Sequence, residues 1–178
     1  GAGAAKTIYS VASYRGGASY NSGATWVNID AYAGTSTIKD WVYSSVQSCF
    51  YMATSSDGNG KVLGKINMAG TRSANDGVGF TGRINAITIV NGYLVVGTTL
   101  GEFYKTPDVA GAQLGAMTFV KIPTNNPSYL PSLPKRIAYG NNKTVALLGK
   151  SSALATSKGQ IGVLNSTLTS FDVVENYN

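Results

Sequence analysis

Side chains that commonly carry out catalysis are scarce in this sequence. It contains no histidine, so the commonest general base and metal ligand is absent. The single cysteine, Cys49, lies in the apolar run QSCFYMA, and we expect a buried free thiol rather than a nucleophile. There is accordingly no zinc constellation, no Ser/His/Asp or Cys/His arrangement and no internal disulfide. We expect no catalytic residue, no metal and no cofactor.

Carboxylates are the other route to hydrolysis, because glycosidases use two acids that flank the scissile bond. None of the eight acids stands in an apolar context that would raise its pKa, so we interpret them as solvated loop carboxylates. They are Asp30, Asp40, Asp57, Asp76, Glu102, Asp108, Asp172 and Glu175. The segment SSDGNGK at 55–61 is similar to a calcium loop through Asp57 and Asn59, but it lacks the later bidentate acid. A strand-connecting turn is the better interpretation.

The chain is basic, but its charges are scattered. Lys and Arg number 14 against 8 Asp and Glu, which gives a formal charge of +6. Such a balance favours acidic partners, yet only Lys135 and Arg136 adjoin and no basic stripe is interleaved with aromatic residues. We expect no specific nucleic-acid binding. No apolar run approaches the roughly 20 residues that span a bilayer, so no membrane insertion is expected.

Length and composition favour one all-β domain over residues 1–178. Only 12% of the 178 residues are charged, whereas 22 are Gly and 11 are Tyr. Gly and Asn supply the positive φ of tight turns, so this composition is typical of many short strands joined by hairpins. Apolar residues at helical spacing do not persist beyond about one turn.

Self-similarity indicates four units, at about 6–30, 38–82, 83–122 and 135–174. In the third, NAITIVN and GYLVVGTT form a hairpin at Asn91-Gly92, followed by GEFYKTP and MTFVKI. The fourth has KRIAYGN, KTVALLGK, SALATSK and TSFDVV, and the second has DWVYSSVQ, CFYMATSS, GKVLGKI and GVGFTG. The first has only KTIYSVAS, GGASYNS and ATWVNI, so it lacks its opening strand. The proline-rich segment at 123–135 separates the last two units, and we interpret it as a loop.

Repeats of about 40 residues with four short strands are typical of β-propeller blades, because each blade buries its faces only by stacking on its neighbours. We predict an all-β, propeller-like fold of four blade-like repeats with the first blade incomplete; a β-sandwich is the alternative. The unpaired sheet edge is tolerated, completed by a preceding segment or covered by another subunit. The N-terminus lacks an initiator Met and a signal peptide, which indicates a piece of a longer chain.

The stretch SYNSGATW at 19–26 resembles the Asp-box, or BNR repeat, of sialidase-like propellers, Ser-x-Asp-x-Gly-x-Thr-Trp. Asn21 stands where the family usually has Asp. The resemblance implies a structural turn between a third and a fourth strand, on the face away from the family's active site. Its residues here are Ser19, Asn21, Gly23, Thr25 and Trp26.

The catalytic machinery of sialidases does not accompany this turn. Those enzymes use six blades, an arginine triad, a Tyr nucleophile with a Glu partner, and an Asp acid/base. The four arginines here fall at different points of the repeat, and neither Arg83-Ile84 nor Arg136-Ile137 is followed by the family's Pro. We therefore expect no glycosidase activity from this chain alone.

A candidate ligand site follows from the propeller plan. Loops between second and third strands, and those linking successive units, project from one face. Aromatic rings there can stack on a sugar while polar groups bind its hydroxyls, although exposed tyrosines without a ligand are the alternative. These loops carry Tyr14, Arg15, Tyr32, Asp57, Asn59, Glu102, Tyr129 and Lys150.

The Gly/Ser/Thr/Asn/Tyr-rich texture is similar in style to phage and viral fibre or spike domains. We predict a non-catalytic virion module, at the virion or extracellular surface, that binds host-surface glycan or other virion proteins, with a homo-oligomer as one way to complete its sheet. The alternatives are a fragment of a sialidase-like glycan-active enzyme and a propeller scaffold or assembly factor.

Overall fold

The computed structural model describes residues 8–11, 16–19, 27–29, 37–55, 62–67, 72–75, 80, 82–125, 132–150 and 159–177 of the 178-residue chain. These residues form antiparallel sheets and one short 3-10 turn, η1 (Leu114–Ala116). The predicted all-β class is therefore confirmed. Within the described residues, no helix has the length and hydropathy needed to cross a membrane.

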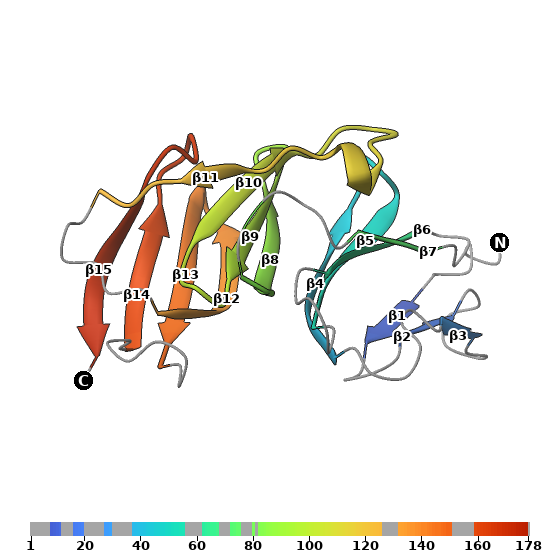
Figure 1. The fold of residues 1–178 in the computed structure, drawn as a ribbon, viewed down its shortest axis with the longest axis horizontal. Coiled ribbons are helices and arrows are strands. Elements are labelled where there is room, and N and C mark those ends of the chain that lie inside the picture. Colours follow the sequence, from blue (N-terminus) through green and yellow to red (C-terminus); the bar gives the residue numbers. More distant parts are fainter. Residues whose placement is uncertain are drawn as a thin grey trace, which may run out of the picture.

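Four sheets follow one another along the chain, and we call them blades 1 to 4 (Figure 1). Blade 1 has three strands, β1 (Ile8–Val11), β2 (Gly16–Ser19) and β3 (Val27–Ile29). Blade 2 consists of β4 (Thr37–Ser44), β5 (Cys49–Ser55), β6 (Val62–Asn67) and β7 (Arg72–Asn75). Blade 3 consists of β8 (Ile84–Val90), β9 (Tyr93–Thr98), β10 (Phe103–Pro107) and β11 (Val120–Ile122). Blade 4 consists of β12 (Leu133–Gly140), β13 (Lys143–Gly149), β14 (Gly159–Leu164) and β15 (Phe171–Tyr177).

The first strands of blades 2, 3 and 4 lie next to one another. β8 contacts both β4 and β12, and the other strands of each blade follow outward in chain order. Four-stranded meanders that meet along their first strands have the plan of propeller blades. The propeller-like prediction, with four blades and the first incomplete, is confirmed, whereas the β-sandwich alternative is wrong. That all 178 residues form one domain stays a prediction.

Tight hairpins form where the sequence supplies residues that tolerate positive φ. Asn91 and Gly92 join β8 to β9 with φ of 48° and 76°. Asn141 and Asn142 join β12 to β13 with φ of 49° and 58°. Positive φ at both central residues matches the twist of the flanking strands, which is why Asn and Gly are favoured there. The hairpin predicted at Asn91-Gly92 is confirmed, and the turn at Asn141-Asn142 has the same backbone geometry.

Two predicted outer strands are wrong. The strand that pairs with β13 is β14 rather than SALATSK, whose residues lie outside the described part of the chain. The last strand of blade 2 is β7 rather than GVGFTG, because Phe80 of that segment lies in the core. Its ring centroid is 5.2 Å from that of Tyr104 and 5.1 Å from that of Phe119. The apolar pattern around Phe80 thus reflected packing between blades.

The core lies between the blades, in two clusters. One joins Tyr51 and Leu63 of blade 2 to Leu94 and Val96 of blade 3, and it contains Cys49, whose predicted burial as a free thiol is confirmed. The other joins blade 3 to blade 4, where the rings of Phe103 and Phe171 are 4.6 Å apart. Blade 3 is therefore covered on both faces.

The described sheets do not close into a ring. Figure 1 shows blade 1 at one end of the long axis and blade 4 at the other. The first and last blades therefore do not stack on each other. The described sheets form an open arc of blades.

Candidate functional site

The same β-bulge occurs near the beginning of each first strand in blades 2 to 4. One residue has no partner in the neighbouring strand, so the register shifts by one. A bulge increases the local twist and redirects side chains. The extra residues are Lys39 of β4, Asn85 of β8 and Lys135 of β12. Two of these three positions thus carry a lysine.

Hydrogen bonds tie the bulged segments together around Asp40, which follows the bulge in β4. Its Oδ2 accepts the backbone N–H of Ile87 at 3.1 Å, and its Oδ1 accepts Nη1 of Arg136 at 2.6 Å. The Asn85 amide also donates to the carbonyl oxygen of Pro134. Three blades therefore share one fixed junction at the beginnings of their first strands.

The interpretation of all eight acids as solvated is wrong for Asp40 and Asp108. Asp40 is 4% exposed and Asp108 is 5% exposed. Burial raises the pKa of Asp40, while its bond from Ile87 and the nearby Arg136 charge counteract that rise. Asp40 pairs with the buried Ala53 in β5, because the bulge at Lys39 sets this register. The sequence contains no pattern that predicts the bulge.

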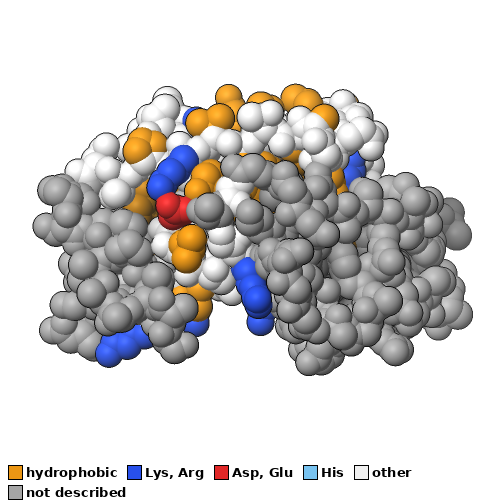
Figure 2. Space-filling model, viewed as in Figure 1, with side chains coloured by type: hydrophobic (Ala, Val, Ile, Leu, Met, Phe, Trp, Pro, Cys, Tyr) orange, Lys and Arg blue, Asp and Glu red, His pale blue; other side chains and the backbone are white. Residues whose placement is uncertain are grey.

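Basic residues surround this junction, and we call them the cationic end: Lys39, Arg83, Lys135, Arg136 and Lys150. Arg83 directly precedes β8, and its carbonyl oxygen accepts the Thr99 N–H at 2.7 Å. Lys150 follows Gly149, which pairs with Leu133 at the beginning of β12. Five cations minus the single charge of Asp40 give +4 for these residues. Lys and Arg side chains are also more prominent than Asp and Glu on the face seen in Figure 2.

Most of the predicted ligand residues lie outside the described part of the chain, namely Tyr14, Arg15, Tyr32, Asp57, Asn59 and Tyr129. Lys150 belongs to the cationic end. Glu102 precedes β10, and its carbonyl oxygen accepts the Thr98 N–H at 2.9 Å. Of the Asp-box residues, Ser19 ends β2, whereas Asn21, Gly23, Thr25 and Trp26 lie outside the described residues. Their predicted roles stay predictions.

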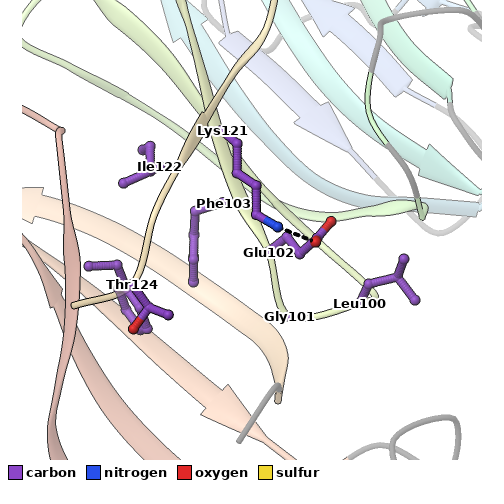
Figure 3. Close-up of a pocket in the computed structure, with 8 residues that line it drawn as sticks. Leu100, Gly101, Glu102, Phe103, Lys121, Ile122 and Thr124 are labelled. Carbon is purple, nitrogen blue, oxygen red and sulfur yellow. Dashed lines mark hydrogen bonds and ion pairs between the residues drawn. The ribbon is translucent and has the colours of Figure 1, made fainter. Parts of the chain in front are cut away.

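The side chain of Glu102 lies beside a small pocket between blades 3 and 4 (Figure 3). The pocket encloses about 230 Å³, below the roughly 300 Å³ at which ligand pockets usually begin. One carboxylate oxygen accepts Nζ of Lys121 at 2.5 Å and the other accepts the hydroxyl of Tyr104 at 2.7 Å. Thr124 lines the opposite end, near Phe103. Glu102 and Lys121 are the charged residues of the pocket lining, and their opposite charges neutralise each other.

A second polar cluster joins blades 2 and 3 in the interior. Asp108 accepts the hydroxyl of Ser44 at 2.7 Å and that of Tyr51 at 3.3 Å. Burial raises the pKa of the Tyr51 phenol, and the neighbouring Asp108 charge adds to the effect. A neutral, fully buried phenol suits a structural hydrogen bond rather than nucleophilic attack. No group of three or more His, Cys, Asp or Glu among the described residues could hold a metal ion.

Comparison with known proteins supports the fold alone. No family model and no curated protein matches the chain. Among solved structures it is similar to the propeller domain of Cps50 (Swd1) from Myceliophteria thermophila, with a TM-score of 0.63, 9% identity, and coverage of 96% of this chain and 55% of that chain. It is also similar to the Dos1 propeller, with a TM-score of 0.62, 14% identity, and coverage of 97% of this chain and 46% of that chain. A third similar structure is YCF48 bound to D1 peptide, with a TM-score of 0.59, 10% identity, and coverage of 94% of this chain and 49% of that chain.

These values place the chain in the β-propeller class of folds. The chain spans about half the length of the solved structures that it matches. Sequence identity of this size carries no information about substrate or partner.

Proposed function

We propose that the chain is a non-catalytic propeller scaffold that binds an acidic segment of a partner protein at the cationic end. The observation that carries this proposal is the repeated bulge, which places Lys39 and Lys135 beside the same rigid junction. Arg83 and Lys150 add positive charge at the same strand ends. The junction holds the backbone that carries these cations, and Lys and Arg side chains attract carboxylates through charge-assisted hydrogen bonds.

Buried polar groups among the described residues support a scaffold over an enzyme. Asp40, Asp108 and Tyr51 are buried and hydrogen-bonded between blades. The thiol of Cys49 is also buried, and burial raises its pKa to about 11, which disfavours the thiolate. Each of these groups stabilises a contact between strands or lies in the core, where a substrate has no access.

One similar structure was solved with a bound peptide, YCF48 with D1 peptide. That binding belongs to YCF48, and it agrees with a protein segment as the class of ligand proposed here. The virion fibre or spike module that attaches to host glycan stays a prediction from composition. A glycan array probed with the same purified chain tests it directly.

The scaffold proposal is tested with a fluorescein-labelled peptide rich in Glu, compared with its Gln analogue by fluorescence polarisation. We expect the Glu peptide to bind and its affinity to fall as salt is raised, because exposed charges are screened within about 10 Å at 0.1 M. The double variant Lys39→Glu with Lys135→Glu should weaken binding at least about tenfold.

The matched control carries the same charge change elsewhere, Lys105→Glu with Lys143→Glu. Lys105 and Lys143 lie on β10 and β13, outside the cationic end. Equal losses in the two double variants would show a non-specific attraction and would overturn the site. Binding of single-stranded DNA but not of the Glu peptide would overturn the protein partner in favour of a nucleic acid.

A further inference from the structure

The side chain of Arg136 is both anchored and exposed. Its Nη1 donates to Oδ1 of Asp40 at 2.6 Å, yet 66% of the side-chain surface of Arg136 remains accessible. A guanidinium carries five N–H donors in one plane, and this bond uses one of them. The edge formed by Nε and Nη2 does not include the bonded atom, and neither of its nitrogens has a hydrogen-bond partner among the described residues. That edge is therefore available to a ligand.

Asp40 is a rigid anchor for this guanidinium. Its carboxylate also accepts the N–H of Trp41 in β4 at 3.0 Å and that of Ile87 in β8 at 3.1 Å. Two backbone donors from different blades thus fix the acceptor that holds Nη1. A guanidinium that already makes one hydrogen bond loses less side-chain freedom when it binds a ligand than a free one does. Arg136 is therefore preorganised for binding.

The neighbouring lysines carry charge without such an anchor. Lys39 and Lys135 are the extra residues of the bulges in β4 and β12, and both side chains are exposed. A Cβ on Gly149 would lie 2.8 Å from Cε of Lys135, so the stem of this lysine lies over the end of β13. Each lysine directly precedes one member of the Asp40–Arg136 pair. A segment with several acids can contact these ammonium groups as well as Arg136.

We propose that the Nε–Nη2 edge of Arg136 binds one carboxylate of the acidic segment through two parallel hydrogen bonds, a role that rests on the proposed function of the cationic end. Two N–H donors in a plane match the two oxygens of a carboxylate, whereas an ammonium group acts as a point charge. Arg136 is thus the residue that selects where an acid of the segment binds. The lysines attract the segment without imposing that geometry.

The first test compares two variants that keep the charge, with the fluorescein-labelled Glu peptide as the probe. Arg136→Lys removes the planar pair of donors at the anchored position. Arg83→Lys is the matched control, because it makes the same exchange at the same end, where the side chain has no hydrogen bond to a described residue. We expect Arg136→Lys to weaken binding at least about fivefold more than Arg83→Lys does. Thermal unfolding verifies that both variants are folded.

A second test observes the contact in the wild-type chain by NMR. The Nε–H resonance of Arg136 is assigned through its covalent connections to the backbone of the ¹⁵N,¹³C-labelled chain. We expect this resonance to move downfield, and its exchange with water to slow, when the Glu peptide is added, because Nε–H then donates to a carboxylate. The Gln analogue should leave it unchanged.

Equal losses of affinity in Arg136→Lys and Arg83→Lys would overturn the role of Arg136 and leave the acidic partner of the cationic end in place. An Nε–H resonance of Arg136 that the bound Glu peptide does not move would do the same. If the wild-type chain bound no Glu peptide at all, both the proposed function and the role of Arg136 would be wrong.

Discussion

Asp40 and Arg136 are separated by 96 residues, yet Oδ1 of Asp40 accepts Nη1 of Arg136 at 2.6 Å. The pair connects the first strand of blade 2 with that of blade 4. The other carboxylate oxygen accepts the N–H of Ile87 in blade 3. One buried carboxylate therefore holds three successive blades, although the side chain of Arg136 remains 66% exposed.

The two partners of this contact should contribute unequally to stability. Asp40→Ala leaves the buried N–H of Ile87 without an acceptor, so we expect a loss of about 2 kcal/mol in the free energy of unfolding. Arg136→Gln removes a donor that is mostly solvated, so we expect a loss of less than about 1 kcal/mol. Urea unfolding of both variants, followed by tryptophan fluorescence, measures the difference. Equal losses would mean that the ion pair, rather than the bond to Ile87, stabilises the junction.

The hairpins were predictable because their cause is local. Asn91-Gly92 and Asn141-Asn142 provide the positive φ that a two-residue turn requires, whatever the rest of the chain does. The junction was not predictable, because the three bulged residues, Lys39, Asn85 and Lys135, have no common residue type. The burial of Asp40 depends on partners 47 and 96 residues away.

The outer strands were the weakest part of the sequence prediction. An outermost strand is half solvated, so it does not need the alternating apolar residues that identify a strand. The strand β7 reads RSAN, whereas the apolar segment that follows it contributes Phe80 to the core. For β14, the segment GQIGVL does not alternate between apolar and polar residues, since Gln160 and Leu164 are buried whereas Ile161 and Val163 are partly exposed.

A substitution at Gly162 tests how tightly blades 3 and 4 pack against each other. A Cβ at this position would overlap the ring of Phe171, which packs on Phe103. Gly162→Ala should therefore lower the free energy of unfolding by about 1–3 kcal/mol through overpacking. Gly140→Ala is the control, because no atom lies within 4 Å of a Cβ built there. Thermal unfolding of the two variants compares them, and equal midpoints would mean that the Phe171 ring shifts at no cost.

A substitution at Asp108 tests how much the polar cluster between blades 2 and 3 contributes to stability. Asp108→Ala leaves the hydroxyls of Ser44 and Tyr51 without their shared acceptor in the interior, so we expect a loss of about 1–3 kcal/mol. Asp172→Ala removes a half-buried carboxylate on β15 and should cost less. Urea unfolding at neutral pH measures both. A smaller loss for Asp108→Ala than for Asp172→Ala would show that water replaces the lost acceptor.

The thiol of Cys49 makes stability depend on alkaline pH. Burial raises its pKa from 9.0 to about 11 in the folded chain, so the folded state keeps this proton where the unfolded state has released it. The unfolded state then binds fewer protons, and the free energy of unfolding falls as pH rises. The contribution is complete below about pH 9 and is lost as the pH rises through about 11, with a total of about 3 kcal/mol. Cys49→Ala should start from a lower stability because of the cavity, and it should lack this part of the decline. Unfolding by urea at several pH values in this range measures the two slopes. Parallel curves for the wild-type chain and Cys49→Ala would assign the decline to other groups, such as tyrosines and lysines.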